Sequence, residues 1–228
     1  MNLFERYSHT APNPSLPPKA VKVALKLCYT SLLVSGFLFA FFRAFPYTGL
    51  MKSTIKKRTW QAIYRLLDSV CPIDGDCGRL CGAACCTAGD TDGEELGIYL
   101  YPGEEKLHSR KDDWLTWTVE NAEDYEFPDS WRGNVYFVKC KTPPHCPRKE
   151  RPLQCRTYPL SPYLDEDGVL KLIYNFEDLP YACPLIEEEI PLNDDFVKAT
   201  YTVWAHLVRD PLIYDLVEAE SRLLDAEL

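Results

Sequence analysis

Thiols are the side chains with the most chemical potential in this chain of 228 residues, because nine of its ten cysteines fall between residues 71 and 183. Four of them lie within Cys77–Cys86, which reads CGRLCGAACC and contains two glycines that let the backbone turn tightly. Thiolates are the ligands that soft and borderline metals prefer, and four suffice for tetrahedral Zn²⁺ or for a [4Fe–4S] cluster. We predict eight metal ligands, namely Cys77, Cys81, Cys85, Cys86, Cys140, Cys146, Cys155 and Cys183.

The number of sites stays open at this point, since the nine cysteines of this region are enough for two. An alternative without metal is a disulfide framework, the usual meaning of dense cysteines in a short secreted chain. Adjacent Cys85 and Cys86 cannot join without strain, and an odd number leaves one thiol over, so we rank disulfides below metal. Cys28 and Cys71 lie outside the dense stretches, and we do not count them as ligands.

Basic residues gather beside the second group of cysteines, in a chain whose net charge is −9. Between residues 139 and 156 there are six, against the single acid Glu150. Guanidinium groups can donate N–H bonds to cysteine sulfur, which stabilises thiolate and raises the reduction potential of a cluster. We therefore predict that Arg151 and Arg156 lie against the bound cofactor. The alternative is that this stretch holds ordinary solvated loop charges.

The stretch Arg151–Pro159 reads RPLQCRTYP. Here the chain resembles the zinc- or iron-chelating cysteine-cluster domain family, also called YkgJ-like, whose pattern is CxxCxxCC followed downstream by RPxxCRxYP. Ile98–Glu105 also resembles that family's segment after its cysteine pair. The first motif departs from the pattern, because spacings of three replace two. The resemblance covers roughly residues 71–185, and a related domain occurs in flagellin lysine N-methylases, so it implies an iron–sulfur cluster over Zn²⁺ and leaves an enzymatic role open.

Several function classes are excluded by what the chain lacks. Neither a dinucleotide-binding GxGxxG nor a phosphate-binding GxxxxGK[ST] occurs, which argues against a Rossmann-type core. Beyond residue 58 there are sixteen basic and thirty-three acidic residues, which argues against nucleic-acid binding. We expect an iron–sulfur protein with a redox or modification-related role and an unidentified protein partner. The alternative is a structural zinc domain that mediates interactions without catalysis.

The first fifty residues differ from the rest. Residues 27–42 form an uncharged apolar run of sixteen, shorter than the about 20 that span a membrane, with a basic excess after it. We interpret residues 1–50 as a tail with a marginal anchor or as a mis-assigned start before Met51, and residues 51–228 as the metal-binding domain. The domain is expected in the cytoplasm, either free or anchored with its metal on that side.

The elements that must position these thiols suggest a small, irregular α+β domain with a short sheet and C-terminal helices. A helix capped by Ser53 or Thr54 should bury Ile55, Ile63, Leu66, Leu67 and Val70. Three extended runs predict strands, at Gly97–Tyr101, Asn134–Val138 and Val169–Phe176. Further helices are expected over Glu104–Glu120, Asp194–Val208 and Leu212–Leu224, with a solvated acidic loop at Glu123–Asp129.

Overall fold

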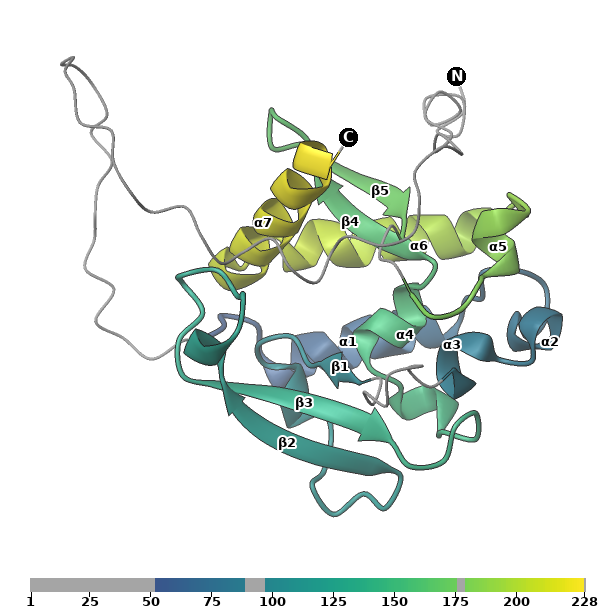
Figure 1. Cartoon of the computed structure of the whole chain (residues 1–228), viewed down its shortest axis with the longest axis horizontal. Helices are drawn as coiled ribbons and strands as arrows, with labels where there is room; N and C mark the ends of the chain where they lie inside the picture. The colour runs from purple at the N-terminus through teal and green to yellow at the C-terminus, as the bar shows by residue number, and fades with distance from the viewer. Residues whose placement is uncertain (1–51, 89–96, 176–178, 228) are drawn as a thin grey trace, which may run out of the picture. The chain divides into compact units, whose positions relative to one another are not determined.

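The computed structural model describes residues 52–88, 97–175 and 179–227, all within the unit that runs from Pro46 to Leu228. The predicted tail and its apolar run at 27–42 lie outside these residues. The fold is α+β, with three longer helices, two small antiparallel sheets and several short helical turns (Figure 1). Across the three described ranges, no helix is long and apolar enough to cross a membrane.

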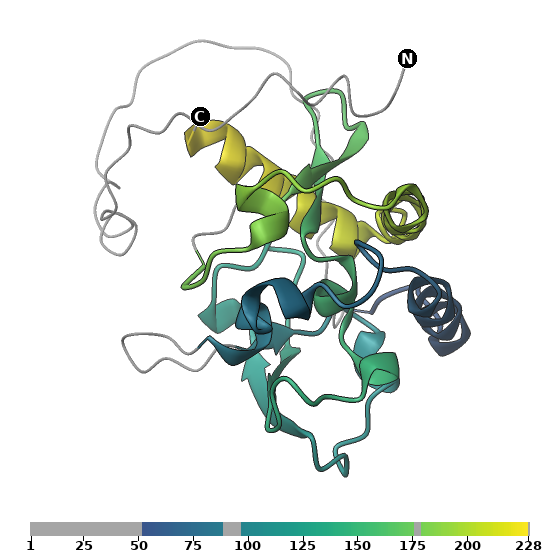
Figure 2. The ribbon, with the colours of Figure 1, turned by 90° about the vertical axis from the view of Figure 1, so that its right-hand side faces the viewer.

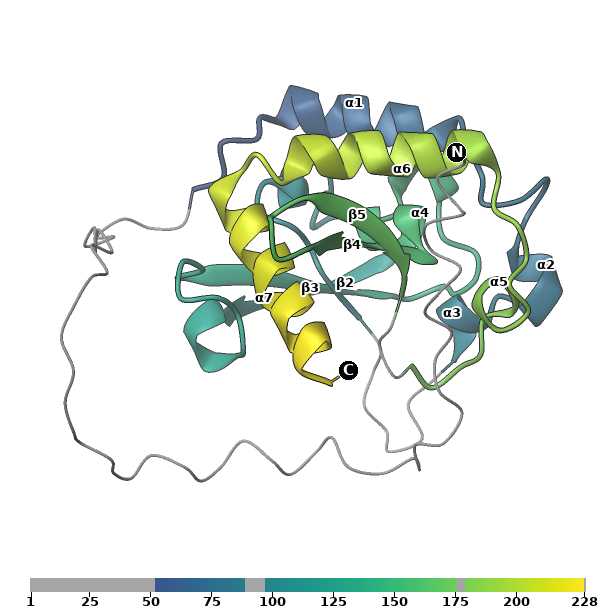
Figure 3. The same cartoon turned by 90° about the horizontal axis from the view of Figure 1, so that it is seen from above.

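The first long helix, α1 (Lys57–Asp68), packs against α6 (Asp194–Leu207), as the view from above shows (Figure 3). It buries Trp60, Ile63, Tyr64 and Leu67, whereas Leu66, which the periodicity predicted to be buried, is 39% exposed. The predicted cap is also wrong, because α1 has no side-chain cap at its N-terminus.

Ser53 and Thr54, the predicted capping residues, form hydrogen bonds with the C-terminal part of the domain instead. Ser53 and Thr54 donate hydroxyl hydrogen bonds of 3.0 and 2.8 Å to the buried carboxylate of Asp210, and the Thr54 amide donates a third. Asp210 lies between α6 and α7 (Pro211–Glu227). Its hydrogen bonds therefore hold the segment before α1 against the junction of these two helices.

Both C-terminal helices are confirmed. In α6 the residues Phe196, Thr200, Val203 and Leu207, which recur at spacings of three and four, are all buried. Asn193 directly precedes α6, but its side-chain amide donates to the Cys71 carbonyl and to Asp74 instead of capping the helix. Pro211 starts α7, because a proline ring fixes a helical φ where no N–H bond is required.

The larger sheet has the strand order β1-β3-β2 and is antiparallel throughout. The bounds are β1 Ile98–Tyr99, β2 Leu115–Asn121 and β3 Asn134–Cys140. Two of these strands lie where the sequence predicted them, β1 shorter and β3 longer. Because β3 ends at Cys140, this predicted ligand lies at the end of the central strand.

A predicted helix over Glu104–Glu120 is wrong. The chain forms only a short 3-10 turn, η2 (Glu104–Lys106), and then enters β2, which pairs with β3 along its whole length. The residues of β2 read LTWTVEN, and threonine, tryptophan and valine favour a pleated surface over a helix. The acidic segment after it is largely exposed, as predicted, apart from the half-buried Phe127 and Pro128, although it opens with the 3-10 turn η3 (Ala122–Asp124).

A second sheet joins β4 (Leu160–Leu164) to β5 (Leu170–Tyr174), and it packs against α7 and α6. The third predicted strand corresponds to β5, while β4 was not foreseen because it contains Pro162. A proline is tolerated there because each strand of a two-stranded sheet is an edge.

Candidate metal centre

Five short segments carry the predicted ligands, and the fold brings their ends to one side of the domain (Figure 2). They are α2 (Gly78–Cys81) with α3 (Ala84–Thr87), the end of β3, the loop that precedes the turn η4 (Arg148–Glu150), α4 (Leu153–Thr157) and α5 (Pro184–Glu187). The buried Leu153 anchors α4 in the main core, and Leu185 does the same for α5. These two anchors fix the positions of Cys155 and Cys183.

One group of thiols consists of Cys86, Cys146 and Cys155, which interact with Arg151, and of Cys140, which interacts with Cys146; we call it the arginine-side group. The Arg151 Nε donates a 3.3 Å hydrogen bond to the Cys146 sulfur. A hydrogen bond from Cys140, together with the hydrogen bond and charge of Arg151, lowers the pKa of Cys146 to about 5 against the effect of burial. Cys146 is therefore disposed to be a thiolate at neutral pH, which is the form that binds metals.

The other members of this group influence one another's protonation. A hydrogen bond with Cys85 lowers the pKa of Cys86 to about 7, and Arg151 contributes in the same direction. Burial and then the charge of Cys86 raise the pKa of Cys155 to about 12, while Arg151 opposes them. Cys155 nevertheless has exposed surface, so we regard its thiol as reachable by metal.

A second group of thiols, Cys77, Cys81, Cys85 and Cys183, lines a cavity of about 20 Å³ together with Tyr158 and Tyr181. We call it the cavity group. It lies where α5 approaches α2 and α3, which are neighbours in all three views of the ribbon. The two groups meet at the adjacent cysteines, whose sulfur atoms are 4.0 Å apart, with Cys85 in the cavity group and Cys86 in the other.

The thiols are neighbours, but they are not arranged as ligands. Within residues 52–88, 97–175 and 179–227, no three His, Cys, Asp or Glu side chains have the geometry to hold a metal ion. All nine cysteines of this region are free thiols, and each has some exposed surface. Rotation about χ1 between staggered wells is open to such side chains. By the chemistry of the donors the residues suit a soft metal.

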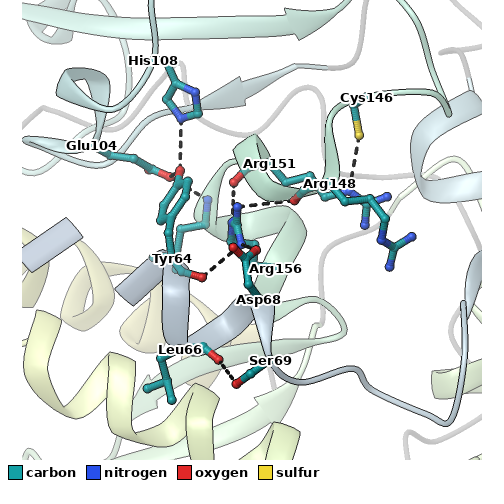
Figure 4. Close-up of polar contacts among 11 residues, drawn as sticks. Tyr64, Leu66, Asp68, Ser69, Glu104, His108, Cys146, Arg148, Arg151 and Arg156 are labelled. Atoms are coloured by element: carbon teal, nitrogen blue, oxygen red, sulfur yellow. Dashed lines mark hydrogen bonds and ion pairs between the residues drawn. The ribbon is translucent and has the colours of Figure 1, made fainter. Parts of the chain in front are cut away.

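The hydrogen bonds of Arg156 go to oxygen acceptors, so its predicted place against the bound cofactor stays a prediction. Its Nε donates to the Arg151 carbonyl at 2.6 Å, and its terminal nitrogens donate to Asp68 at 2.6 Å and to the carbonyls of Tyr64 and Arg148 at 3.4 Å (Figure 4). The guanidinium carbon also lies 4.0 Å from the centre of the Tyr64 ring. Arg156 therefore ties α1 to the loop before α4 and does not donate to sulfur, whereas Arg151 does.

The other basic residues of this stretch also differ in their contacts. Lys141 and Lys149 are exposed, so the solvated-charge alternative holds for them. Arg148 forms a half-exposed ion pair of 3.1 Å with Asp76, next to Cys77.

The structure contains a buried polar network beside α4 that the sequence did not predict. The carboxylate of Glu104 is fully buried and accepts hydrogen bonds from the Tyr64 hydroxyl and the Leu153 amide, both at 2.6 Å, and from the Tyr101 amide at 3.0 Å. The His108 ring lies 3.1 Å from the same hydroxyl (Figure 4). Burial raises the pKa of Glu104. Because Leu153 is the first residue of α4, this network fixes the helix that carries Cys155.

Burial has the opposite effect on the histidine of this network. It lowers the pKa of His108 to about 4, so the ring is neutral at physiological pH. The only sequence signal for the network was the similarity of Ile98–Glu105 to a family segment.

Comparison of the chain with protein-family models, curated proteins and solved structures found no match. The resemblance to the YkgJ-like family therefore stays a prediction that depends on the motifs themselves.

Proposed function

We propose that this chain is an iron–sulfur protein whose arginine-side group, Cys86, Cys140, Cys146 and Cys155, holds one [4Fe–4S] cluster. The observation that carries the proposal is the 3.3 Å hydrogen bond from Arg151 to the sulfur of Cys146, within a set of four thiols drawn from four segments. Such a cluster, when bound, supplies one-electron transfer.

The chain's own residues account for the properties that such a site requires. Four thiolates around an oxidised cluster carry a net negative charge, and Arg151 compensates part of it while donating to sulfur. Glu104 holds the start of α4 and thereby fixes Cys155. Cys140 and Cys155 retain exposed surface, so a cluster there would lie near solvent, where a protein partner can exchange electrons with it.

We also propose the compartment and the role of this protein from its free thiols. Nine free thiols persist in a reducing compartment, which favours the cytoplasm. We propose an electron-transfer or redox-sensing role, or assistance to a modification reaction, with a protein as partner.

Anaerobic purification of the full chain tests the proposal. We expect a brown protein with broad visible absorption and equal amounts of iron and acid-labile sulfide. The variant Cys140→Ser should lose both, and Cys71→Ser should keep both, because Cys71 belongs to neither group of thiols. A colourless protein that binds only zinc would overturn the iron–sulfur proposal and favour a structural zinc domain.

A further inference from the structure

We propose that the free edge of β2 is a docking surface for a second copy of this chain, so that the two β2 strands pair antiparallel and join the larger sheets of both copies. The inference concerns neither group of thiols and does not depend on the iron–sulfur proposal. It starts from the strand order β1-β3-β2, which leaves β2 at the outside of its sheet (Figure 1).

The first argument is that β2 has backbone groups that β3 does not use. In an antiparallel ladder alternate residues bond to the neighbouring strand. At the two ends of β2, the Trp114 carbonyl accepts a bond from the strand-end amide of Lys141, and the Ala122 amide donates to the Gly133 carbonyl. The even-numbered residues therefore face β3, and the N–H and C=O groups of the odd-numbered residues point outward. The outward residues are Leu115, Trp117, Val119 and Asn121.

The second argument is that this edge lacks the devices that usually protect one. Proteins protect edge strands with proline, lysine, a bulge or a covering element. The residues of β2, LTWTVEN, include no proline and no basic residue, and the register with β3 is continuous. Within the described ranges, no backbone bond reaches Trp117 or Val119 from the open side, and no helix or strand except β3 makes extended contact with β2. Val119 is 43% exposed.

The third argument is that β2 is complementary to itself in one register. A two-fold axis at Thr118 places each Trp117 opposite Val119 of the second copy, and a pair of an aromatic and a β-branched residue is favourable across strands. The outward backbone groups of Trp117 and Val119 then meet each other on both sides of the axis. The two Thr118 residues face each other at the axis as a closely spaced pair without mutual backbone bonds.

The charges near the edge also favour a second copy. In this register Glu120, the single charged residue of β2, lies opposite Thr116 of the second copy. Thr116 in turn pairs with Lys139 of its own sheet, so the acid of one copy and the base of the other lie in the same row on one face. Association therefore brings opposite charges together along the joined sheet and places no like charges directly opposite each other in the two β2 strands.

Sedimentation velocity of the full chain under reducing conditions tests the inference. We expect the mass to rise with concentration from that of one chain to that of two. Thr118→Lys and Thr118→Glu each place like charges across the axis, so each should weaken the dimer by about fivefold or more. The two variants mixed in equal amounts should associate again, because lysine then faces glutamate.

Two further variants separate the edge from the rest of the strand. Val119→Pro keeps the pairing with β3, because its N–H points outward, but it removes one donor from each copy and should weaken the dimer by about tenfold or more. Thr116→Lys is the matched control, since its lysine would face Glu120 of the second copy and should leave the dimer intact. Circular dichroism of each variant checks that the fold is retained, as the exposure of Thr116 and Thr118 leads us to expect.

Four results would overturn the inference. One is a single-chain mass at every concentration, and another is undiminished association of Thr118→Lys and Val119→Pro. A third is an equal loss of association in Thr116→Lys and Thr118→Lys. The fourth is failure of the mixed lysine and glutamate variants to associate, which would favour an extended segment of another protein as the occupant of this edge. None of these results changes the iron and sulfide content, so the iron–sulfur proposal is tested separately.

Discussion

Substitution of Arg156 by alanine should destabilise the fold and leave the metal chemistry in place. The side chain is 4% exposed, and its guanidinium donates to one carboxylate and three backbone carbonyls. Alanine removes all four hydrogen bonds and leaves the partly buried carbonyls of Arg151 and Tyr64 without this donor. The contact between α1 and the loop before α4 is then lost.

The size of the effect follows from these contacts. Hydrogen bonds to charged groups contribute about 1.5–3 kcal/mol each, and removing one partner of a buried ion pair costs about 3–5 kcal/mol. The Asp68 side chain is 29% exposed and can be rehydrated, which reduces the cost. We expect a loss of about 2–4 kcal/mol, equivalent to a fall of about 5–15 °C in Tm for a domain of this size.

Thermal unfolding followed by circular dichroism measures the change, together with metal content and reduction potential. Arg148→Ala is a matched control, because that side chain is 50% exposed and its ion pair with Asp76 is equally open, so the loss should be at most about 1 kcal/mol. Arg156→Lys should restore part of the stability through Asp68 but not the three carbonyl contacts. An unchanged Tm with a shifted reduction potential in Arg156→Ala would refute the reasoning and return Arg156 to the cofactor.

Three further outcomes are expected. Arg151→Ala should lower the reduction potential of the cluster and reduce Tm less than Arg156→Ala does; voltammetry that finds no shift would remove Arg151 from the site. The pKa of His108 is depressed from 6.5 to about 4, so its contribution to stability is present above pH 6.5 and is lost as the pH falls toward 4. Relative to His108→Asn, the native chain should lose up to about 3 kcal/mol over that range, while the exposed His206→Asn should follow the native chain in urea titrations. Glu104→Gln should cost about 1–3 kcal/mol, because its amide N–H₂ would face the Tyr101 amide. Since burial raises the pKa of Glu104, the stabilising effect of its protonated form is lost as the pH rises, so the difference between the native chain and Glu104→Gln should be smaller at pH 8 than at pH 4.5.

The sequence predicted those elements whose signals are local and repeated. Helix α6 has apolar residues at spacings of three and four after Asn193, and α7 starts at a proline, so both could be located. Strand β2 was mistaken for a helix because the charged residues before it, in Glu104–Asp113, obscured a short β-branched and aromatic run. Its conformation is decided by pairing with β3, which is a long-range contact.

The roles of the arginines show why the site itself was only partly predictable. Neighbouring residues on an α-helix point about 100° apart, so Arg156 cannot face the same target as Cys155 within α4. Arg151 precedes the helix and is free of that constraint. The spacing of residues did not predict the role of Glu104, because two of its three donors, Tyr64 and Leu153, come from segments that are adjacent to it only in the folded chain.

The central claim is that the thiols of this domain are metal ligands, and the unfolding of the reduced protein with and without metal tests it most directly. Thiolate sites contribute about 10–16 kcal/mol of apparent binding free energy in small zinc domains, against a total stability of about 5–15 kcal/mol for a whole domain. We predict that complete removal of metal under reducing conditions abolishes cooperative unfolding or lowers Tm by tens of degrees. An unchanged Tm in fully reduced, metal-free protein would show that the cysteines are not ligands.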